Sequence, residues 1–167
     1  MKSKLDKKQI ERFSRQIVLK NIGVIGQKKI IQSKVLIIGM GGLGCPVAEF
    51  LTRAGIGTLG LVDSDNVELS NIHRQSLYNI GDIKKTKVIA AQKKLKKINP
   101  KTKVLCHKLR INKNNFNKIL KKYDYVVDGS DNFKTKFLIN DFCKASKKFL
   151  VSAAISKFDG HIFTFDF

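Results

Sequence analysis

The chain has 167 residues, the length of one ordinary domain, which leaves little room for a second. Hydrophobic residues make up 43% and charged residues 28%, a composition typical of soluble globular chains that excludes wholesale disorder. Lysine and arginine number 33 against 13 acidic residues, a net charge of +20 that favours a polyanionic partner such as nucleic acid. However, 28 of the 33 are lysine, whereas base readout and bidentate phosphate binding favour arginine. Nucleic-acid binding therefore stays open but is not favoured.

The sequence lacks the patterns of secretion, membrane insertion and structural zinc. The basic N-terminus is not followed by the apolar stretch of a signal peptide. The longest stretch without charge, residues 35–48, has 14 residues and four glycines, too short and too glycine-rich to span a membrane. Cys45, Cys106 and Cys143 form neither a C-x-x-C pair nor a cluster with histidine, so we expect no zinc site in this chain. We expect a cytoplasmic protein that does not bind membranes.

Along the chain, helices come first, and strands then alternate with helices. Leu5–Leu19 has the apolar spacing of one amphipathic helix, with Ile10 and Phe13 on its apolar face. Gly26–Gln32 predicts a second, short helix. Further helices are predicted over residues 47–54, 86–98, 114–121 and 132–146. Strands are predicted over residues 34–38, 58–62, 103–107, 125–127, 149–153 and 160–165.

Short apolar strands alternating with helices predict an α/β fold. We expect a Rossmann-like, mostly parallel sheet with helices on both faces, preceded by an N-terminal helical segment. The last strand follows its predecessor too closely for a crossover helix and is expected to pair antiparallel. Residues 1–32 then form the N-terminal segment, and residues 33–167 form the Rossmann-like domain.

A glycine-rich loop follows the first predicted strand and opens the next helix. Gly39, Gly41 and Gly44 have the G-x-G-x-x-G spacing, with Gly42 between them. Without side chains, such a backbone can approach phosphate oxygens, and the helix N-terminus supplies N–H groups. Asp63, 24 residues after Gly39, ends the next strand, where a carboxylate can accept ribose hydroxyls. These residues predict a nucleotide site without distinguishing NAD, FAD and ATP.

The residues beyond Asp63 favour chemistry on a triphosphate. Arg74 and Lys87 can stabilise the charge that spreads over phosphoryl oxygens in the transition state. Asp131, after a later strand of the same sheet, can hold Mg²⁺ over the crevice. Each residue also has a simpler interpretation: Lys87 as a solvated lysine, Asp131 as a helix N-cap, and Arg74 as the partner of an acid. Their joint occurrence near strand ends favours a functional role.

Several segments at these spacings carry a family resemblance. They are ERFSRQI, GMGGLGCPVAEFL, LVDSDNVELSNIHRQ, VVDGSDNF and LVSAAISKFDGHIFTF, and the resemblance extends from about Glu11 to the last residue. Together they resemble the ThiF/MoeB/HesA family of ubiquitin-activating-enzyme-like adenylyltransferases. The chain most resembles the bacterial members that adenylate the sulfur-carrier proteins of molybdopterin and thiamine biosynthesis.

The resemblance implies a nucleotidyltransferase that uses ATP and Mg²⁺. Its substrate would be the C-terminal Gly-Gly carboxylate of a small ubiquitin-like sulfur carrier, converted to an acyl-adenylate with release of pyrophosphate. The catalytic residues implied are Arg15, Arg74, Lys87 and Asp131. The nucleotide-binding residues implied are Gly39, Gly41, Gly42, Gly44, Asp63, Asp65, Ser70, Asn71, Arg74, Lys87, Asp131 and Asn132. Asp131 would also hold Mg²⁺.

Arg15 resembles the arginine that family members donate to the site of a partner subunit. The resemblance therefore implies a homodimer in which residues 1–32 form a dimer and active-site arm, and residues 33–167 form the ATP-binding adenylation domain. Full-length members continue with two zinc-binding C-x-x-C pairs and a surface that binds the carrier's tail. Because these are missing, we expect a domain incomplete at its C-terminus, either a fragment or a natural short form.

Two other functions stay open. One is a tRNA-modifying dehydratase of the same family, which would activate a carboxylate bound to nucleic acid. The other is a non-catalytic module that binds nucleotide or only completes a dimer. A dehydrogenase is disfavoured by the SNIHRQ segment and Lys87. Cys45 and Cys143 are interpreted as core residues. His73 is interpreted as a hydrogen-bonding residue, and His107 and His161 are interpreted as structural or exposed.

Overall fold

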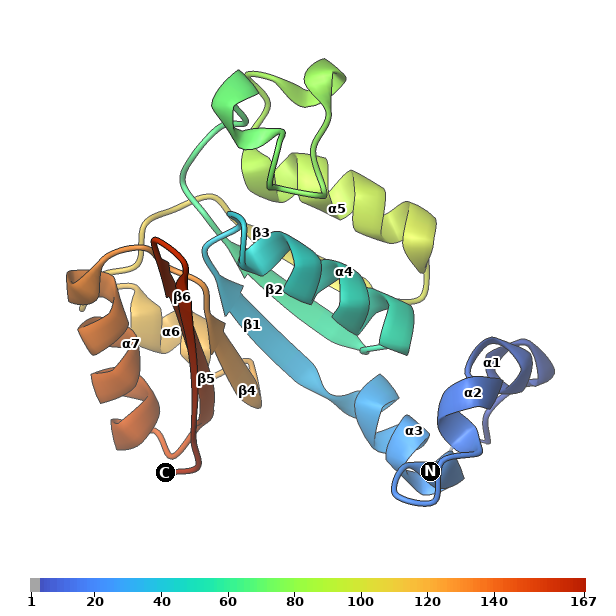
Figure 1. Cartoon of the computed structure of the whole chain (residues 1–167). Coiled ribbons are helices and arrows are strands. Elements are labelled where there is room, and N and C mark those ends of the chain that lie inside the picture. The colour runs from blue at the N-terminus through green and yellow to red at the C-terminus, as the bar shows by residue number, and fades with distance from the viewer. Residues whose placement is uncertain (1–3) are drawn as a thin grey trace.

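The computed structural model describes residues 4–167, which form one six-stranded sheet with helices on both faces (Figure 1). The strand order is β3-β2-β1-β4-β5-β6; the first five strands run parallel, and β6 is antiparallel to β5. The strands are β1 (Lys34–Ile38), β2 (Thr58–Val62), β3 (Lys103–His107), β4 (Tyr125–Asp128), β5 (Phe149–Ser156) and β6 (Asp159–Phe165). The predicted Rossmann-like α/β architecture, with its antiparallel last strand, is confirmed.

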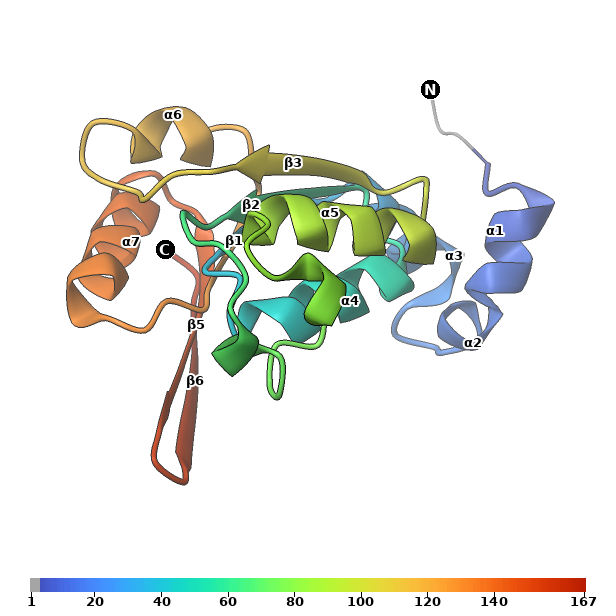
Figure 2. The same ribbon diagram turned by 90° about the horizontal axis from the view of Figure 1, so that it is seen from above.

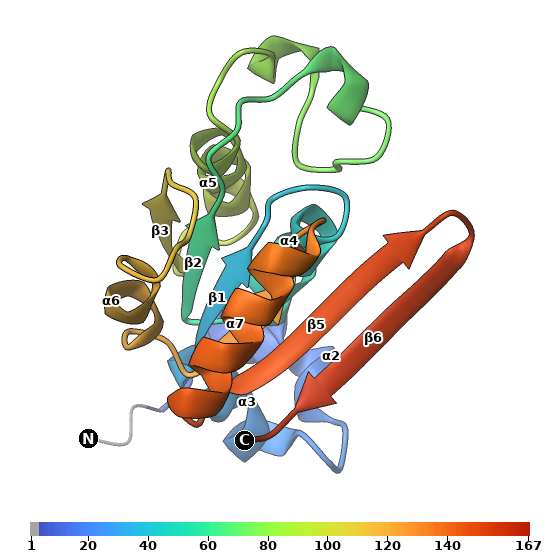
Figure 3. The ribbon, with the colours of Figure 1, turned by 90° about the vertical axis from the view of Figure 1, so that its left-hand side faces the viewer.

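The helices form two layers and an N-terminal group. Helices α4 and α5 lie on one face of the sheet, and α6 and α7 lie on the other (Figures 2 and 3). The helices are α1 (Lys7–Arg12), α2 (Ser14–Ile17), α3 (Gly23–Gln32), α4 (Gly44–Ala54), α5 (Lys87–Ile98), α6 (Phe116–Leu120) and α7 (Phe133–Ala145), with short 3₁₀ helices η1 (Leu69–Asn71) and η2 (Ile80–Asp82). Within residues 4–167, no helix is long and apolar enough to cross a membrane.

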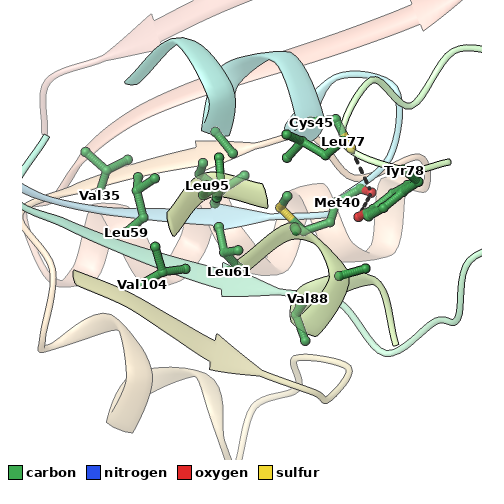
Figure 4. Packing of buried hydrophobic residues seen from close by; sticks show 14 of the residues in the cluster. Val35, Met40, Cys45, Leu59, Leu61, Leu77, Tyr78, Val88, Leu95 and Val104 are labelled. Carbon is green, nitrogen blue, oxygen red and sulfur yellow. Dashed lines mark hydrogen bonds between the residues drawn. The ribbon is translucent and has the colours of Figure 1, made fainter. Parts of the chain in front are cut away.

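The central strand β1 explains why its sequence is apolar throughout. Side chains alternate between the two faces of a strand, and both faces of this sheet are covered. Val35 and Ile37 therefore pack in the cluster under α4 and α5, part of which is shown in Figure 4. Leu36 and Ile38 pack in the second cluster, under α6 and α7. Every apolar residue of this strand is buried, and its carboxyl end is a rigid base for the glycine loop.

The prediction of one continuous helix over Leu5–Leu19 is wrong. The chain breaks at Phe13, where the backbone leaves helical geometry between α1 and α2. The Phe13 ring is buried against Gly55, where a Cβ would lie 2.4 Å from the ring Cζ atom. Ile10, predicted on the apolar face, is 49% exposed. The buried ring of Phe13 and the hydrogen bond from Arg12 Nη2 to the carbonyl oxygen of Ile98 at 2.7 Å both join this segment to the domain.

The remaining boundaries differ by a few residues. Helix α4 begins at Gly44 and α3 at Gly23, each three residues before its prediction, while α6 is shorter than predicted at both ends. Strand β5 continues to Ser156, three residues beyond its prediction, because β6 pairs with it along its whole outer part. The last residue of β5 that pairs with β4 is Ser152, so the β5–β6 hairpin projects from the sheet beyond that point (Figure 3).

Candidate nucleotide-binding and transfer site

The glycines of the loop after β1 divide into two kinds. Gly39 has a φ of +89°, and a Cβ there would lie 2.8 Å from the carbonyl oxygen of Gly129. A Cβ at Gly44 would lie 1.9 Å from the carbonyl oxygen of Gly39. Backbone packing therefore requires both residues to be glycine. At Gly41 and Gly42 a Cβ would meet only ordinary contacts, so packing does not require glycine there, and the open surface is left for a ligand.

Met40 lies inside the loop, and both its backbone N–H and its carbonyl oxygen are hydrogen-bonded to side chains. Its N–H donates to Asp63 Oδ2 at 2.8 Å. Its carbonyl oxygen accepts from Tyr78 Oη at 3.0 Å and from Cys45 Sγ at 3.5 Å (Figure 4). Burial raises the pKa of the Tyr78 hydroxyl, which keeps it a donor at neutral pH. The loop is thus preorganised by side chains from three separate segments.

Asp63 lies at the carboxyl end of β2, as predicted. Oδ2 accepts from Met40, and Oδ1 accepts from the N–H of Asp65 at 2.8 Å. Each carboxylate oxygen can accept a second hydrogen bond, and the residue is only partly buried. The carboxylate is therefore oriented by the backbone and retains acceptor sites for hydroxyl groups of a ligand.

Arg74 lies over the glycine loop. Its Cγ and Cδ atoms are 3.7 Å from a Cβ built at Gly42, and Nη1 donates to the carbonyl oxygen of Ser70 at 2.8 Å. The structure therefore places Arg74 next to the loop. Its position is explained by the contact with Gly42 and the bond to Ser70, without an acidic partner. His73 is exposed, with Nε2 3.4 Å from Arg74 Nη1.

Ser70 and Asn71 are used in the local structure of η1. Asn71 is buried, and its Oδ1 accepts from the N–H of Glu68 at 3.1 Å. The hydroxyl of Ser70 donates to Glu68 Oε2 at 3.3 Å. These contacts support the turn that carries Arg74, and binding of nucleotide by either side chain stays a prediction.

Lys87 is the first residue of α5 and is 7% exposed, so the interpretation of a solvated lysine is wrong. Its Nζ lies 3.3 Å from Oδ2 of Asp65, whose side chain is 58% exposed. A buried cation paired with an exposed carboxylate can change partner when a more highly charged anion arrives, because the carboxylate can turn into water. Until such an anion binds, the ion pair with Asp65 orients the ammonium group of Lys87.

Asp131 and Asn132 follow β4, the strand next to β1 in the sheet. Asn132, not Asp131, caps α7, because its Oδ1 accepts from the N–H of Thr135 at 2.9 Å. The N-cap interpretation of Asp131 is therefore wrong. The Asp131 carboxylate is exposed, and its Oδ1 accepts from Asn132 Nδ2 at 3.3 Å.

A single carboxylate at this place fits one metal ion. Within residues 4–167, no three His, Cys, Asp or Glu side chains gather as a metal site. Magnesium usually takes one or two carboxylates and completes its coordination with substrate phosphates and water. Asp131 therefore fits Mg²⁺ carried by a nucleotide, not a dedicated protein cage.

Arg15, in α2, lies away from these residues. The N-terminal helices are at the edge where the strands begin, whereas the glycine loop, Asp63 and Asp131 are at the edge where the strands end (Figure 1). The Arg15 side chain is exposed. Within one chain, the structure does not bring Arg15 together with the other predicted catalytic residues.

The cysteines and the two remaining histidines are structural or peripheral. Burial raises the pKa of Cys45 to about 11 and that of Cys143 to about 12, so both thiols are protonated at neutral pH and are poor nucleophiles. Both residues are fully buried, which confirms their interpretation as core residues. His107 Nε2 lies 3.0 Å from Tyr123 Oη. His161 is exposed on β6 and stacks on Phe163.

Two buried residues at this edge were not predicted as functional. Gln75 is 3% exposed, its Oε1 has no hydrogen-bond partner among residues 4–167, and its Nε2 is 3.8 Å from a Cβ built at Gly41. Asp128, the last residue of β4, is 1% exposed and makes four hydrogen bonds. The sequence indicates Asp128 only as a polar residue that ends the apolar run of β4. Asp131, three residues later, was the carboxylate predicted as functional.

Comparison with known proteins agrees with this geometry. A model described as the ThiF family matches residues 13–166. The adenylyltransferase and sulfurtransferase MOCS3 of Drosophila willistoni is 43% identical over 167 residues, covering 100% of this chain and 36% of the relative. The sulfur carrier protein adenylyltransferase of Thermus thermophilus is 42% identical over 159 residues, covering 95% of this chain and 59% of the relative.

Solved structures of similar fold are also known. The E. coli tRNA N6-threonylcarbamoyladenosine dehydratase in complex with AMP is similar with a TM-score of 0.81 at 25% identity, covering 88% of this chain and 60% of that chain. The present chain thus spans between about a third and three fifths of the length of the relatives it matches. Because the family model covers nearly the whole chain and the relatives exceed 40% identity, the chain belongs to the ThiF family.

Proposed function

We propose that this chain carries the ATP-binding part of an enzyme that adenylates the C-terminal Gly-Gly carboxylate of a ubiquitin-like sulfur carrier. The observation that carries the proposal is an open glycine surface at Gly41 and Gly42 with Arg74 over it and the buried cation Lys87 at the same edge of the sheet. The names of the MOCS3 and Thermus relatives, which are adenylyltransferases, support this activity.

The residues supply binding and charge stabilisation rather than a nucleophile. The carrier's carboxylate attacks the α-phosphorus of ATP, a P–O bond to the β-phosphate breaks, and pyrophosphate leaves with that electron pair. Negative charge grows on the phosphoryl oxygens, where Arg74 and Lys87 stabilise it once Lys87 has left Asp65. Backbone N–H groups at Gly42 bind phosphate, and Asp63 accepts the ribose hydroxyls. The protonated thiols fit this mechanism, since no enzyme nucleophile takes part.

Asp131, with Asn132 beside it, would hold Mg²⁺ together with the phosphates of the nucleotide. When bound, the ion neutralises charge on the phosphates and on the leaving pyrophosphate. The AMP complex of the E. coli dehydratase supports a nucleotide site in this fold.

The proposed active unit is a homodimer. Arg15 is exposed at the edge of the sheet opposite its own glycine loop, so a second copy is needed to bring an Arg15 to each site. In this proposal residues 1–32 are the arm that supplies Arg15, and residues 33–167 are the adenylation domain. The pathway proposed is molybdopterin or thiamine biosynthesis in the cytoplasm.

Two observations support other functions. The net charge of +20 and the likeness to the E. coli tRNA dehydratase favour, as a second candidate, activation of a carboxylate on tRNA with the same ATP site. The third candidate is a module that binds nucleotide without catalysis.

Exchange of radiolabelled pyrophosphate into ATP separates these functions. We expect exchange with a carrier ending in Gly-Gly and none with tRNA or without a second substrate. Exchange only with tRNA would replace the proposal by the dehydratase. ATP binding without exchange under any of these conditions would leave the non-catalytic module.

A further inference from the structure

Asp128 is the most completely bonded charged side chain at the carboxyl edge of the sheet. It is 1% exposed. Its Oδ1 accepts from the N–H of Ser130 at 2.9 Å and from Ser130 Oγ at 2.6 Å. Its Oδ2 accepts from Lys136 Nζ at 2.9 Å and from Ser152 Oγ at 2.7 Å. Four hydrogen bonds use both acceptor positions of each oxygen, so this carboxylate has none left for a ligand.

Stability alone does not account for a buried ion pair here. Desolvation of Asp128 and of Lys136 opposes folding, and apolar residues of similar volume often stabilise a fold as well as such a pair does. The pair differs from an apolar contact in its directional bonds. Directional bonds fix the positions of the groups that they join, and this is the property through which the pair can serve a function at this edge.

The bonds of Asp128 fix two segments that meet the nucleotide site. Ser130 belongs to the loop Gly129–Asn132, which carries Asp131. The same loop touches the glycine loop, because a Cβ at Gly39 would be 2.8 Å from the oxygen of Gly129 and 3.2 Å from the nitrogen of Ser130. Residues 129–130 therefore pack directly against the backbone at Gly39.

The other two bonds fix the point at which the β5–β6 hairpin leaves the sheet. Ser152 is paired with Asp128 across β4 and β5 and is the last such pair. Lys136 Nζ also donates to the carbonyl oxygen of Ala153 at 2.7 Å, the first residue of β5 beyond β4. One carboxylate thus joins the loop of Asp131, the first turns of α7 and the base of the projecting hairpin.

We propose that Asp128, with Lys136 and Ser152, is a positioning residue that holds the loop Gly129–Asn132 and the glycine loop in the geometry for nucleotide binding. It acts through Ser130 and touches no substrate. This inference rests on the proposed function for the identity of the nucleotide, but its structural part is independent of catalysis.

The test compares an apolar pair with the native one. The double variant Asp128→Leu/Lys136→Met removes the buried carboxylate and its partly buried ammonium partner together, so no unpaired charge is left behind and we expect it to fold. Its melting temperature should be lower than that of the native chain, because the N–H of Ser130 and the hydroxyls of Ser130 and Ser152 lose their acceptor. Its affinity for ATP with Mg²⁺, measured by calorimetry, should fall by about tenfold or more. Hydrogen exchange at the amide of Ser130 should accelerate in the same variant, because its acceptor is gone. In the exchange assay, KM for ATP should rise by more than kcat falls.

Thr102→Val is the matched control. Thr102 is 1% exposed, and its Oγ1 donates to the carbonyl oxygen of Ile56 at 2.9 Å at the opposite edge of the sheet. Its loss should lower the melting temperature without changing the affinity for ATP. Should Asp128→Leu/Lys136→Met also fail to fold, Ser152→Ala, which removes one bond and no charge, provides the same readouts with smaller changes.

A folded variant that binds ATP as tightly as the native chain would overturn the inference, whether or not exchange at Ser130 is fast. Neither readout needs a carrier. Absence of pyrophosphate exchange in the native chain would therefore contradict the proposed function alone, and the positioning role would still be decided by ATP affinity and amide exchange.

Discussion

The two edges of the sheet differ in whether they bury charged side chains. At the edge where the strands begin, the buried polar residues are neutral and include Gln27, Thr52, Asn99 and Thr102. In the described chain, both buried charged residues, Lys87 and Asp128, are at the edge where the strands end. Burying a charge is far more costly than burying an amide or a hydroxyl. The first edge is therefore built for stability, and the second holds the charges to which we assign roles in the proposed function.

Removal of a cation from the carboxyl edge should give the largest effect. Arg74→Ala or Lys87→Ala should slow adenylation by about 10²–10³-fold, because charge on the α-phosphate then loses a fixed partner, while ATP affinity stays nearly unchanged. Arg53→Ala and Lys93→Ala, exposed residues of α4 and α5, are the controls. Pyrophosphate exchange and calorimetry measure the two quantities. Loss of ATP affinity at an unchanged rate would contradict a transition-state role.

Mixing two inactive variants tests whether Arg15, at the amino edge of one chain, reaches the site at the carboxyl edge of a partner chain. Arg15→Ala and Asp131→Ala should each be inactive alone. If dimers exchange subunits at random, about a quarter of the sites in an equal mixture hold both native residues, and exchange activity should recover to about that fraction. Mixing either variant with itself is the control. No recovery, despite proven subunit exchange, would show that Arg15 is not donated by a partner.

A change at the amino edge should affect stability alone. In Gly55→Ala, the new methyl group meets the Phe13 ring at a position with φ of +92°. Strain and overpacking should lower the free energy of unfolding by about 2 kcal/mol, a fall in melting temperature of about 4–8 °C. Gly160→Ala, where a Cβ meets no atom within 4 Å, is the control. Reduced ATP affinity in folded Gly55→Ala would break the proposed division between the edges.

His107 is a residue of the carboxyl edge for which we expect an effect on stability alone. It is the last residue of β3, and its ring contacts the Tyr123 hydroxyl. Burial, assisted by the charge of Lys122, lowers the pKa of His107 below its ordinary value of 6.5. Below about pH 6.5 the unfolded chain therefore binds a proton before the folded chain does, and stability falls as pH falls.

We expect the smallest effect from His107→Gln, which removes this proton. The melting temperature of the variant should fall less between pH 7 and pH 5 than that of the native chain, with ATP affinity at pH 7.5 unchanged. His161→Gln, exposed on β6, should leave the pH dependence as it is. An unchanged pH profile in His107→Gln would show that other groups carry the acid sensitivity.

Local patterns predicted most of the elements because the physics behind them is local. An apolar run such as β1 must be buried on both faces wherever it lies, and the spacing of Val88, Ala91 and Leu95 requires one buried helix face. The prediction of one N-terminal helix failed because the contact of Phe13 with Gly55, not the apolar spacing, decided the course of the chain. That contact joins residues distant in the sequence, and spacing carries no information about it.

The sequence by itself determined the fold class, the glycine loop, and the placing of Asp63, Lys87 and Asp131 at or just beyond strand and helix ends, since these depend on periodicity and on the order of elements along the chain. Only the tertiary structure decided that Gly39 and Gly44 serve packing while Gly41 and Gly42 are open, and that Lys87 is buried. The tertiary structure also revealed Asp128 as the junction of loop, helix and hairpin. Burial and hydrogen bonding are properties of neighbours in space, and folding brings those neighbours together from distant parts of the chain.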